Sequence, residues 1–160
     1  MSKYSKLFKD VTKGEDTVPS QEDIAYELNP EKEERFSILF VDDEENVLNA
    51  LRRIFLEENY EIFTAGSAAD ALQIMEREKV HLVISDHRMP VITGSQLLKE
   101  IKQKWPDTIR IMLTGYSDVQ SIMGAVNEGA VYKFITKPWN DEDLRLTVSL
   151  ALQQYVLIQE

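Results

Sequence analysis

Short runs of consecutive apolar residues alternate along the chain with longer segments in which apolar residues recur every three or four positions. The short runs predict strands buried on both faces, and the longer segments predict amphipathic helices. The strand candidates are SILFVD at 37–42, YEIFTA at 60–65, HLVISD at 81–86, TIRIMLT at 108–114 and VYKFIT at 131–136. Helices are expected at 44 to about 59, 67 to about 78, 93 to about 105, 117 to about 129, and 140 to the end.

Five strands that alternate with five helices require a parallel sheet with helices on both faces, because right-handed crossover connections place them there. The expected fold class is therefore α/β, a doubly wound five-stranded parallel sheet formed by residues 36–149. Residues 1–35 are polar and mixed in charge. They predict an extension outside this domain, with short helices at most.

Composition narrows the possible partners. The 18 basic and 28 acidic residues give a net charge of −10, which repels nucleic acid and anionic lipid alike. The sequence has no cysteine, no signal peptide pattern and no apolar run long enough to span a membrane. We expect a cytoplasmic protein that binds neither nucleic acid nor membrane directly.

Polar residues that follow the apolar runs carry the candidate chemistry. Because parallel strands share one carboxyl edge, the residues at that edge converge on one place. They are Asp42, Asp43, Asp86, Thr114 and Lys137. Three adjacent carboxylates repel one another unless a cation compensates them, and oxygen ligands without His or Cys favour Mg²⁺. With a lysine and a hydroxyl nearby, this set predicts phosphoryl transfer with Asp86 as nucleophile.

Four ordered motifs resemble the receiver domains of two-component response regulators, of the chemotaxis-receiver-like kind. They are FVDDE at 40–44, SDHRMP at 85–90 with Gly94 after it, LTGYSD at 113–118 and FITKPW at 134–139. The resemblance implies a flavodoxin-like (βα)5 fold whose Asp86 accepts a phosphoryl group from the phosphohistidine of a sensor histidine kinase. It implies a phosphoacceptor signalling domain that switches a fused or separate output domain, not an enzyme acting on other substrates.

The resemblance also implies a set of magnesium ligands. Asp43, Asp86 and the backbone carbonyl of Arg88 would bind Mg²⁺ directly, and Asp42 would act through a water molecule. The lysine would pair with Asp86 and then with the phosphoryl group, and the bond Lys137-Pro138 is expected to be cis.

Two further pairs of residues have expected roles near the phosphoryl group. By the resemblance, Thr114 and Phe134 are the switch residues: the hydroxyl moves onto a phosphoryl oxygen and the ring turns inward behind it. Arg88 and Tyr116 lie two residues after Asp86 and Thr114, where side chains overhang the site in this family. We hypothesise that these two large side chains hinder the attacking water and make autodephosphorylation slow.

Other interpretations of the site remain open. The same fold can serve as a phosphorylation-independent interaction scaffold, and failure to bind magnesium would favour that reading. An aspartyl-phosphate phosphatase usually needs an acid where Arg88 stands, and a flavin site lacks its phosphate loop because DDEEN repels phosphate. His81 is interpreted as structural, and His87 as a solvated loop residue because nothing orients it as a base.

The last helix shows a heptad-like pattern. Its positions step by four, three, four and three residues at Leu144, Val148, Ala151, Tyr155 and Ile158. This pattern predicts that residues 150–160 are the start of a signalling helix. The helix would pair with a second copy and lead into an output domain. The motif NEGAVYKFITKPW resembles receivers fused to cyclic-dinucleotide phosphodiesterases or other signalling enzymes, which does not identify the output. The alternative is a terminal helix packed on the sheet, with Leu146, Leu150 and Leu157 part of its apolar content.

Overall fold

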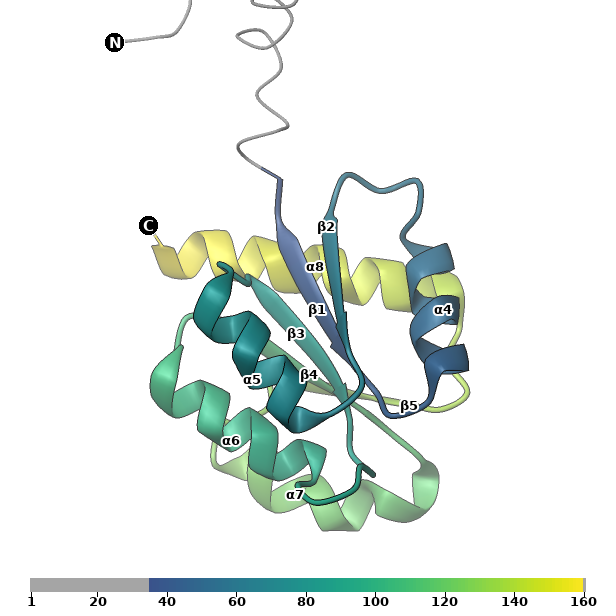
Figure 1. Cartoon of the computed structure of the whole chain (residues 1–160), viewed down its shortest axis with the longest axis vertical. Coiled ribbons are helices and arrows are strands. Elements are labelled where there is room, and N and C mark those ends of the chain that lie inside the picture. Colours follow the sequence, from purple (N-terminus) through teal and green to yellow (C-terminus); the bar gives the residue numbers. More distant parts are fainter. Residues whose placement is uncertain (1–34, 160) are drawn as a thin grey trace, which may run out of the picture. The chain divides into compact units, whose positions relative to one another are not determined.

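A five-stranded parallel sheet organises the part of the chain that the computed structural model describes, residues 35–159 (Figure 1). Its strands are β1 (Ser37–Val41), β2 (Glu61–Ala65), β3 (Leu82–Asp86), β4 (Ile109–Thr114) and β5 (Lys133–Thr136). They lie in the order β2-β1-β3-β4-β5, with every neighbouring pair parallel. The doubly wound, flavodoxin-like class expected from the sequence is confirmed. The expectations for residues 1–34 lie outside the described residues.

Helices cover both faces of this sheet. They are α4 (Glu45–Ile54), α5 (Ala68–Arg77), α6 (Gly94–Lys104), α7 (Val119–Asn127) and α8 (Asp141–Gln159), with a 3-10 turn η1 (Tyr116–Asp118) before α7. Figure 1 shows α5, α6 and α7 on one face and α4 and α8 on the other. Successive strand residues face opposite sides, so Leu39 and Val41 join the first apolar cluster while Ile38 and Phe40 join the second. Within residues 35–159, no helix combines the length and apolar character that a membrane span requires.

Two helices differ from their expected bounds. Helix α4 ends at Ile54, about one turn early, because Phe55 leaves the helical path and stacks on Phe40 with ring centroids 5.7 Å apart. Helix α7 begins at Val119, because the residues before it form the 3-10 turn η1. Asp118 stands at the N-cap of α7, and its side chain makes no capping hydrogen bond.

The heptad-like pattern of α8 faces the protein's own sheet. Four of its five positions are buried in the second apolar cluster: Leu144, Val148, Ala151 and Tyr155. The prediction that these positions form a seam with a second copy is therefore wrong for the described helix. A period of about 3.5 residues marks whichever side of a helix is buried, and here the sheet buries it. The side chains of Leu146, Leu150 and Leu157, the outer leucines, are exposed instead.

His81 stabilises the end of the sheet at which the strands begin, opposite their carboxyl ends. The backbone N–H of Ser37 donates to its Nδ1 at 2.9 Å, and its ring lies 5.2 Å from Phe36 and 4.8 Å from Tyr155. Burial lowers the pKa of His81, and the nearby Lys79 lowers it further. The hydrogen bond uses the lone pair of Nδ1, so this contact requires the unprotonated nitrogen. The interpretation of His81 as structural is confirmed.

We predict that the pKa of His81 makes the protein less stable in mild acid. A histidine whose pKa is lower in the folded state contributes stability above its unfolded pKa of 6.5, and that contribution is lost as the pH falls through 6.5 toward the folded value. Urea unfolding between pH 7.5 and 5 measures the loss. The matched control is His81→Asn, which keeps an acceptor for Ser37 but does not titrate. If wild type and variant lose stability in parallel, His81 is not the cause.

Candidate functional site

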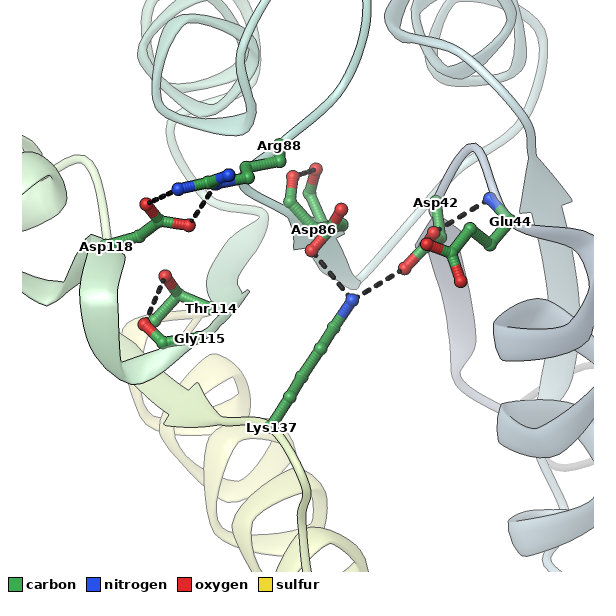
Figure 2. Close-up of polar contacts among 9 residues, drawn as sticks. Asp42, Glu44, Asp86, Arg88, Thr114, Gly115, Asp118 and Lys137 are labelled. Atoms are coloured by element: carbon green, nitrogen blue, oxygen red, sulfur yellow. Dashed lines mark hydrogen bonds and ion pairs between the residues drawn. The ribbon is translucent and has the colours of Figure 1, made fainter.

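The carboxyl edge of the sheet collects the polar residues that the sequence placed at strand ends. Asp86 ends β3 opposite Leu113 of β4, and Thr114 ends β4 opposite Thr136 of β5. Asp42 and Asp43 follow β1, and Lys137 follows β5. Figure 2 shows how the side chains of Asp42, Asp86 and Lys137 meet at this edge.

Lys137 bridges two of the carboxylates. Its Nζ lies 2.8 Å from Oδ1 of Asp86 and 3.2 Å from Oδ2 of Asp42, and all three side chains are largely buried. The lysine is fixed from its backbone too, because its N–H donates to the carbonyl of Thr114 at 2.8 Å. The bond from Lys137 to Pro138 is cis, as the resemblance implied. One ammonium group therefore ties together the ends of β1, β3 and β5.

The two partners of this ion pair have shifted pKa values. Burial raises the pKa of Asp86; the hydrogen bond from Lys137 opposes this rise, and the negative charges of Asp42 and Asp43 add to it. Burial alone would lower the pKa of Lys137, but the hydrogen bond and charge of Asp86, together with Asp42, outweigh it and raise the pKa. The lysine is thus held in its charged form beside the carboxylate that it pairs with.

The three aspartates form a cluster suited to a divalent cation. One carboxylate oxygen from each of Asp42, Asp43 and Asp86 lies within 4.8 Å of the others. Asp42 is fixed, since its Oδ1 accepts the backbone N–H of Glu44 at 2.9 Å, whereas Asp43 is exposed. A single lysine does not balance three carboxylates, and all the donors in the cluster are hard oxygens. These residues fit Mg²⁺.

Gly94 allows helix α6 to begin directly against the end of β3. Its N–H donates to the carbonyl of His87 at 2.8 Å, and a side-chain Cβ at this position would overlap the carbonyl oxygen of Asp86. The helix is capped just before it, where Thr93 and Gln96 form a reciprocal capping box. A glycine is therefore required for α6 to pack against the backbone that carries Asp86.

The two expected switch residues lie on β4 and β5, the strands that follow β3 in the sheet. The hydroxyl of Thr114, on a buried residue, donates to the carbonyl of Gly115 at 3.3 Å (Figure 2). Phe134 is half-buried and packs against the apolar cluster that α5, α6 and α7 cover. Thr114 thus lies at the carboxyl edge, whereas Phe134 lies farther back in the sheet, opposite Met112 of β4.

Arg88 and Asp118 form an ion pair that sequence reasoning missed. Nε and Nη2 of Arg88 donate to Oδ2 and Oδ1 of Asp118 at 2.6 and 2.8 Å, across the loops that follow β3 and β4. The hydrogen bond from Arg88 lowers the pKa of Asp118. Asp118 is the last residue of the motif LTGYSD, but nothing in the sequence indicates that it pairs with a residue thirty positions earlier. Tyr116, the other large residue of this loop, is exposed.

His87 is buried, so the interpretation of a solvated loop residue is wrong. Its N–H donates to the carbonyl of Leu113 at 3.0 Å, which continues the pairing of β3 with β4 by one residue. Its carbonyl accepts from Gly94, and its Nδ1 lies 3.2 Å from Oγ of Ser95. The contact with Ser95 places the ring at the start of α6.

Comparisons with known proteins agree with this geometry. The family model described as response regulator receiver domain matches residues 38–149. The chain is 42% identical over 124 residues to the hydrogenase transcriptional regulatory protein HoxA of Bradyrhizobium diazoefficiens, covering 78% of this chain and 25% of HoxA. It is 38% identical over 117 residues to the transcriptional regulatory protein GlrR of Escherichia coli K12, covering 73% of this chain and 26% of GlrR. The chain thus spans about a quarter of the length of these relatives.

Solved structures show the same likeness. The signal receiver domain of an HD domain-containing protein from Pseudomonas fluorescens Pf-5 is 39% identical with a TM-score of 0.73, covering 76% of this chain and 97% of that one. A response regulator receiver domain protein from Clostridium thermocellum is 30% identical with a TM-score of 0.72, covering 77% and 98%. Sequence motifs, fold and relatives converge, and the chain belongs to the response regulator receiver domain family, a family of signalling domains.

Proposed function

We propose that this receiver accepts a phosphoryl group on Asp86 from the phosphohistidine of a sensor histidine kinase and thereby switches an output domain. The observation that carries the proposal is the 2.8 Å ion pair between Lys137 and Asp86 beside two further aspartates. A nucleophilic carboxylate, a fixed cation and a metal-binding cluster are the parts that phosphoryl transfer needs.

The transfer is an in-line displacement at phosphorus. An oxygen of the Asp86 carboxylate forms the new O–P bond while the P–N bond of the phosphohistidine breaks, and the electron pair of that bond returns to the imidazole. Lys137 is within reach of the oxygens that carry the transferred charge, because it already contacts Asp86. Lys137 therefore stabilises both the nucleophile before transfer and the phosphoryl group after it.

Magnesium is the proposed cofactor. Asp43, Asp86 and the backbone carbonyl of Arg88 would hold it directly, with Asp42 acting through a water molecule. When bound, the ion neutralises negative charge on the phosphoryl oxygens. The three carboxylates within 4.8 Å of one another support this assignment.

Phosphorylation is proposed to act through Thr114 and Phe134. The Thr114 hydroxyl would leave the carbonyl of Gly115 and donate to a phosphoryl oxygen, and the ring of Phe134 would then turn inward behind it. The position of Thr114 at the end of β4 and the half-buried ring of Phe134 on the adjacent β5 support this route. The side chain at 134 has no hydroxyl, so the signal consists of ring position alone.

The proposed partners follow from the relatives. The relatives include proteins named as transcriptional regulatory proteins and the receiver of an HD domain-containing protein. We therefore propose a fused or separate output domain and assign it no particular activity. We propose residues 36–149 as the receiver domain, residues 1–35 as an extension and residues 150–160 as the start of a signalling helix. The receiver would act in the cytoplasm without touching nucleic acid or membrane itself, since the net charge of −10 on the 160-residue chain repels both.

A homodimer through α8 is also proposed, with the outer leucines as its surface. Leu146, Leu150 and Leu157 are spaced by four and seven residues, so they lie on one side of the helix, and they are 58%, 48% and 63% exposed.

We predict that Leu150→Glu raises the Kd of the dimer of the 160-residue chain at least about tenfold, because a buried carboxylate would face the partner. Analytical ultracentrifugation over a range of concentrations measures this Kd. The matched control is Leu56→Glu, since Leu56 is an exposed leucine outside α8. A wild type that is monomeric at every concentration rules out this dimer.

The proposed function predicts a magnesium-dependent gain of one phosphoryl group on Asp86. Incubation with Mg²⁺ and acetyl phosphate should add one phosphoryl mass to the wild type, because Asp86 supplies the nucleophile. Asp86→Asn should show no such gain, since the amide is not nucleophilic. Intact mass spectrometry makes the measurement, and circular dichroism checks that the variant is folded. No gain with any phosphodonor would favour the interaction scaffold.

We also propose that the side chains of Arg88 and Tyr116 hinder the attacking water and give the phosphoryl group a long lifetime. The double variant Arg88→Ala/Tyr116→Ala should shorten the lifetime of the phosphorylated protein roughly threefold to tenfold, or about 1 kcal/mol in activation free energy, because water reaches the phosphorus more easily. The loss of phosphoryl mass with time after removal of the donor measures it. An unchanged or longer lifetime contradicts the hypothesis.

A further inference from the structure

The ion pair between Arg88 and Asp118 joins the two loops that flank the proposed phosphorylation site. Arg88 lies two residues after Asp86, and Asp118 four residues after Thr114. The two side chains differ in freedom: the Arg88 side chain is 74% exposed, whereas that of Asp118 is 12% exposed at the start of α7. The arginine can therefore move, and the aspartate is held by the fold.

A chain of contacts leads from this ion pair to Thr114. The backbone N–H of Asp118 donates to the carbonyl of Gly115 at 3.0 Å, and the hydroxyl of Thr114 donates to the same carbonyl at 3.3 Å. Figure 2 shows the guanidinium of Arg88 turned toward Asp118, on the side away from Asp86. The carbonyl of Gly115 thus binds both the backbone of Asp118 and the Thr114 hydroxyl, which the proposed switch must release.

A phosphoryl group on Asp86 would compete with Asp118 for Arg88. Such a group carries about two negative charges and three acceptor oxygens. The charge of Asp86 already acts on Arg88, since it contributes to the raised pKa of the guanidinium after the larger contribution of Asp118. A bidentate arginine–carboxylate pair and an arginine–phosphoryl pair use the same donors, so the guanidinium cannot make both fully.

We propose that the Arg88–Asp118 ion pair is a latch that opposes phosphorylation. The ion pair keeps the side chain of Arg88 turned away from Asp86. It also keeps the loop after β4 in the conformation in which the Thr114 hydroxyl donates to the carbonyl of Gly115. The phosphoryl group opens the latch when Arg88 binds it and leaves Asp118. Asp118 is a positioning residue that acts through Arg88. This inference rests on the proposed function, because it assumes that Asp86 accepts the phosphoryl group.

The test measures the affinity of the whole chain for beryllofluoride, a phosphoryl analogue, in the presence of Mg²⁺. The reporter is the fluorescence of Trp139, two residues after Lys137, with Trp105→Phe present in all variants. Asp118→Asn should bind beryllofluoride roughly threefold to tenfold more tightly, because Arg88 is free to turn. Damage to the fold would weaken binding instead, so a gain in affinity separates the latch from a structural role.

Two controls isolate the ion pair. In an Arg88→Ala background, Asp118→Asn should change the affinity by less than about twofold, because no latch remains to open. Glu128→Gln removes another paired carboxylate just beyond the far end of α7, 3.2 Å from Lys99, and should leave the affinity unchanged. An unchanged or weaker affinity of Asp118→Asn overturns the latch, and so does an equal gain in the Arg88→Ala background, which would indicate charge repulsion alone.

A second measurement uses the unaltered protein. The Nε–H resonance of Arg88, assigned by its loss in Arg88→Lys, should shift on saturation with beryllofluoride and Mg²⁺, because its acceptor changes. A resonance that stays at its position in the saturated protein overturns the latch while leaving the proposed function intact. A wild type that binds no beryllofluoride and gains no phosphoryl mass contradicts the proposed function itself, and the latch with it.

Discussion

The repulsion among three carboxylates at one edge of the sheet is the constraint on which the rest of this domain depends. A parallel sheet brings the ends of its strands together, and residues 42, 43 and 86 therefore lie close to one another whatever their charge. Lys137 makes this arrangement tolerable by pairing with Asp86 and Asp42 at once. Such a pair is worth little as a source of stability, because desolvation offsets most of its attraction, and it leaves a net negative charge. That remaining charge is what suits the edge to a divalent cation.

Much of the fold and half of the site could be predicted because they depend only on the spacing of apolar residues and on the order of strands and helices along the chain. Continuous apolar runs identify strands buried on both faces, and the strand-end rule then selects Asp86, Thr114 and Lys137 without any knowledge of their contacts. What the rule cannot supply is which side chains meet across two loops. The pairing of Arg88 with Asp118 depends on the direction in which each loop leaves its strand, and no local pattern records that direction.

The errors share a physical cause, since each assigned an environment from the chain's local pattern. A heptad-like period shows that one side of a helix is buried, but the burying surface can be a second chain or the protein's own sheet. In α8 it is the sheet, which takes Val148 and Tyr155 and leaves Leu146 and Leu150 outside. The sequence around His87 holds no residue that would orient its ring, which predicts a solvated loop position, yet a backbone hydrogen bond to Leu113 extends the strand pairing past Asp86 and draws the residue inside.

Helix α7 begins without a side-chain cap although an aspartate stands at its N-cap position, and this feature connects the latch to the helix. An aspartate at an N-cap normally accepts a backbone N–H from the first turn, which is worth about 1 kcal/mol. Asp118 occupies that position, but its carboxylate is bound to Arg88 instead. If the phosphoryl group takes the arginine, the carboxylate of Asp118 is released at the start of α7, where the backbone N–H of Val119 already donates to the carbonyl of Tyr116. The lost ion pair is then partly replaced by the favourable interaction of a carboxylate with the helix dipole at the N-terminus of α7, so opening the latch costs less than breaking an isolated ion pair and alters the start of α7 at the same time.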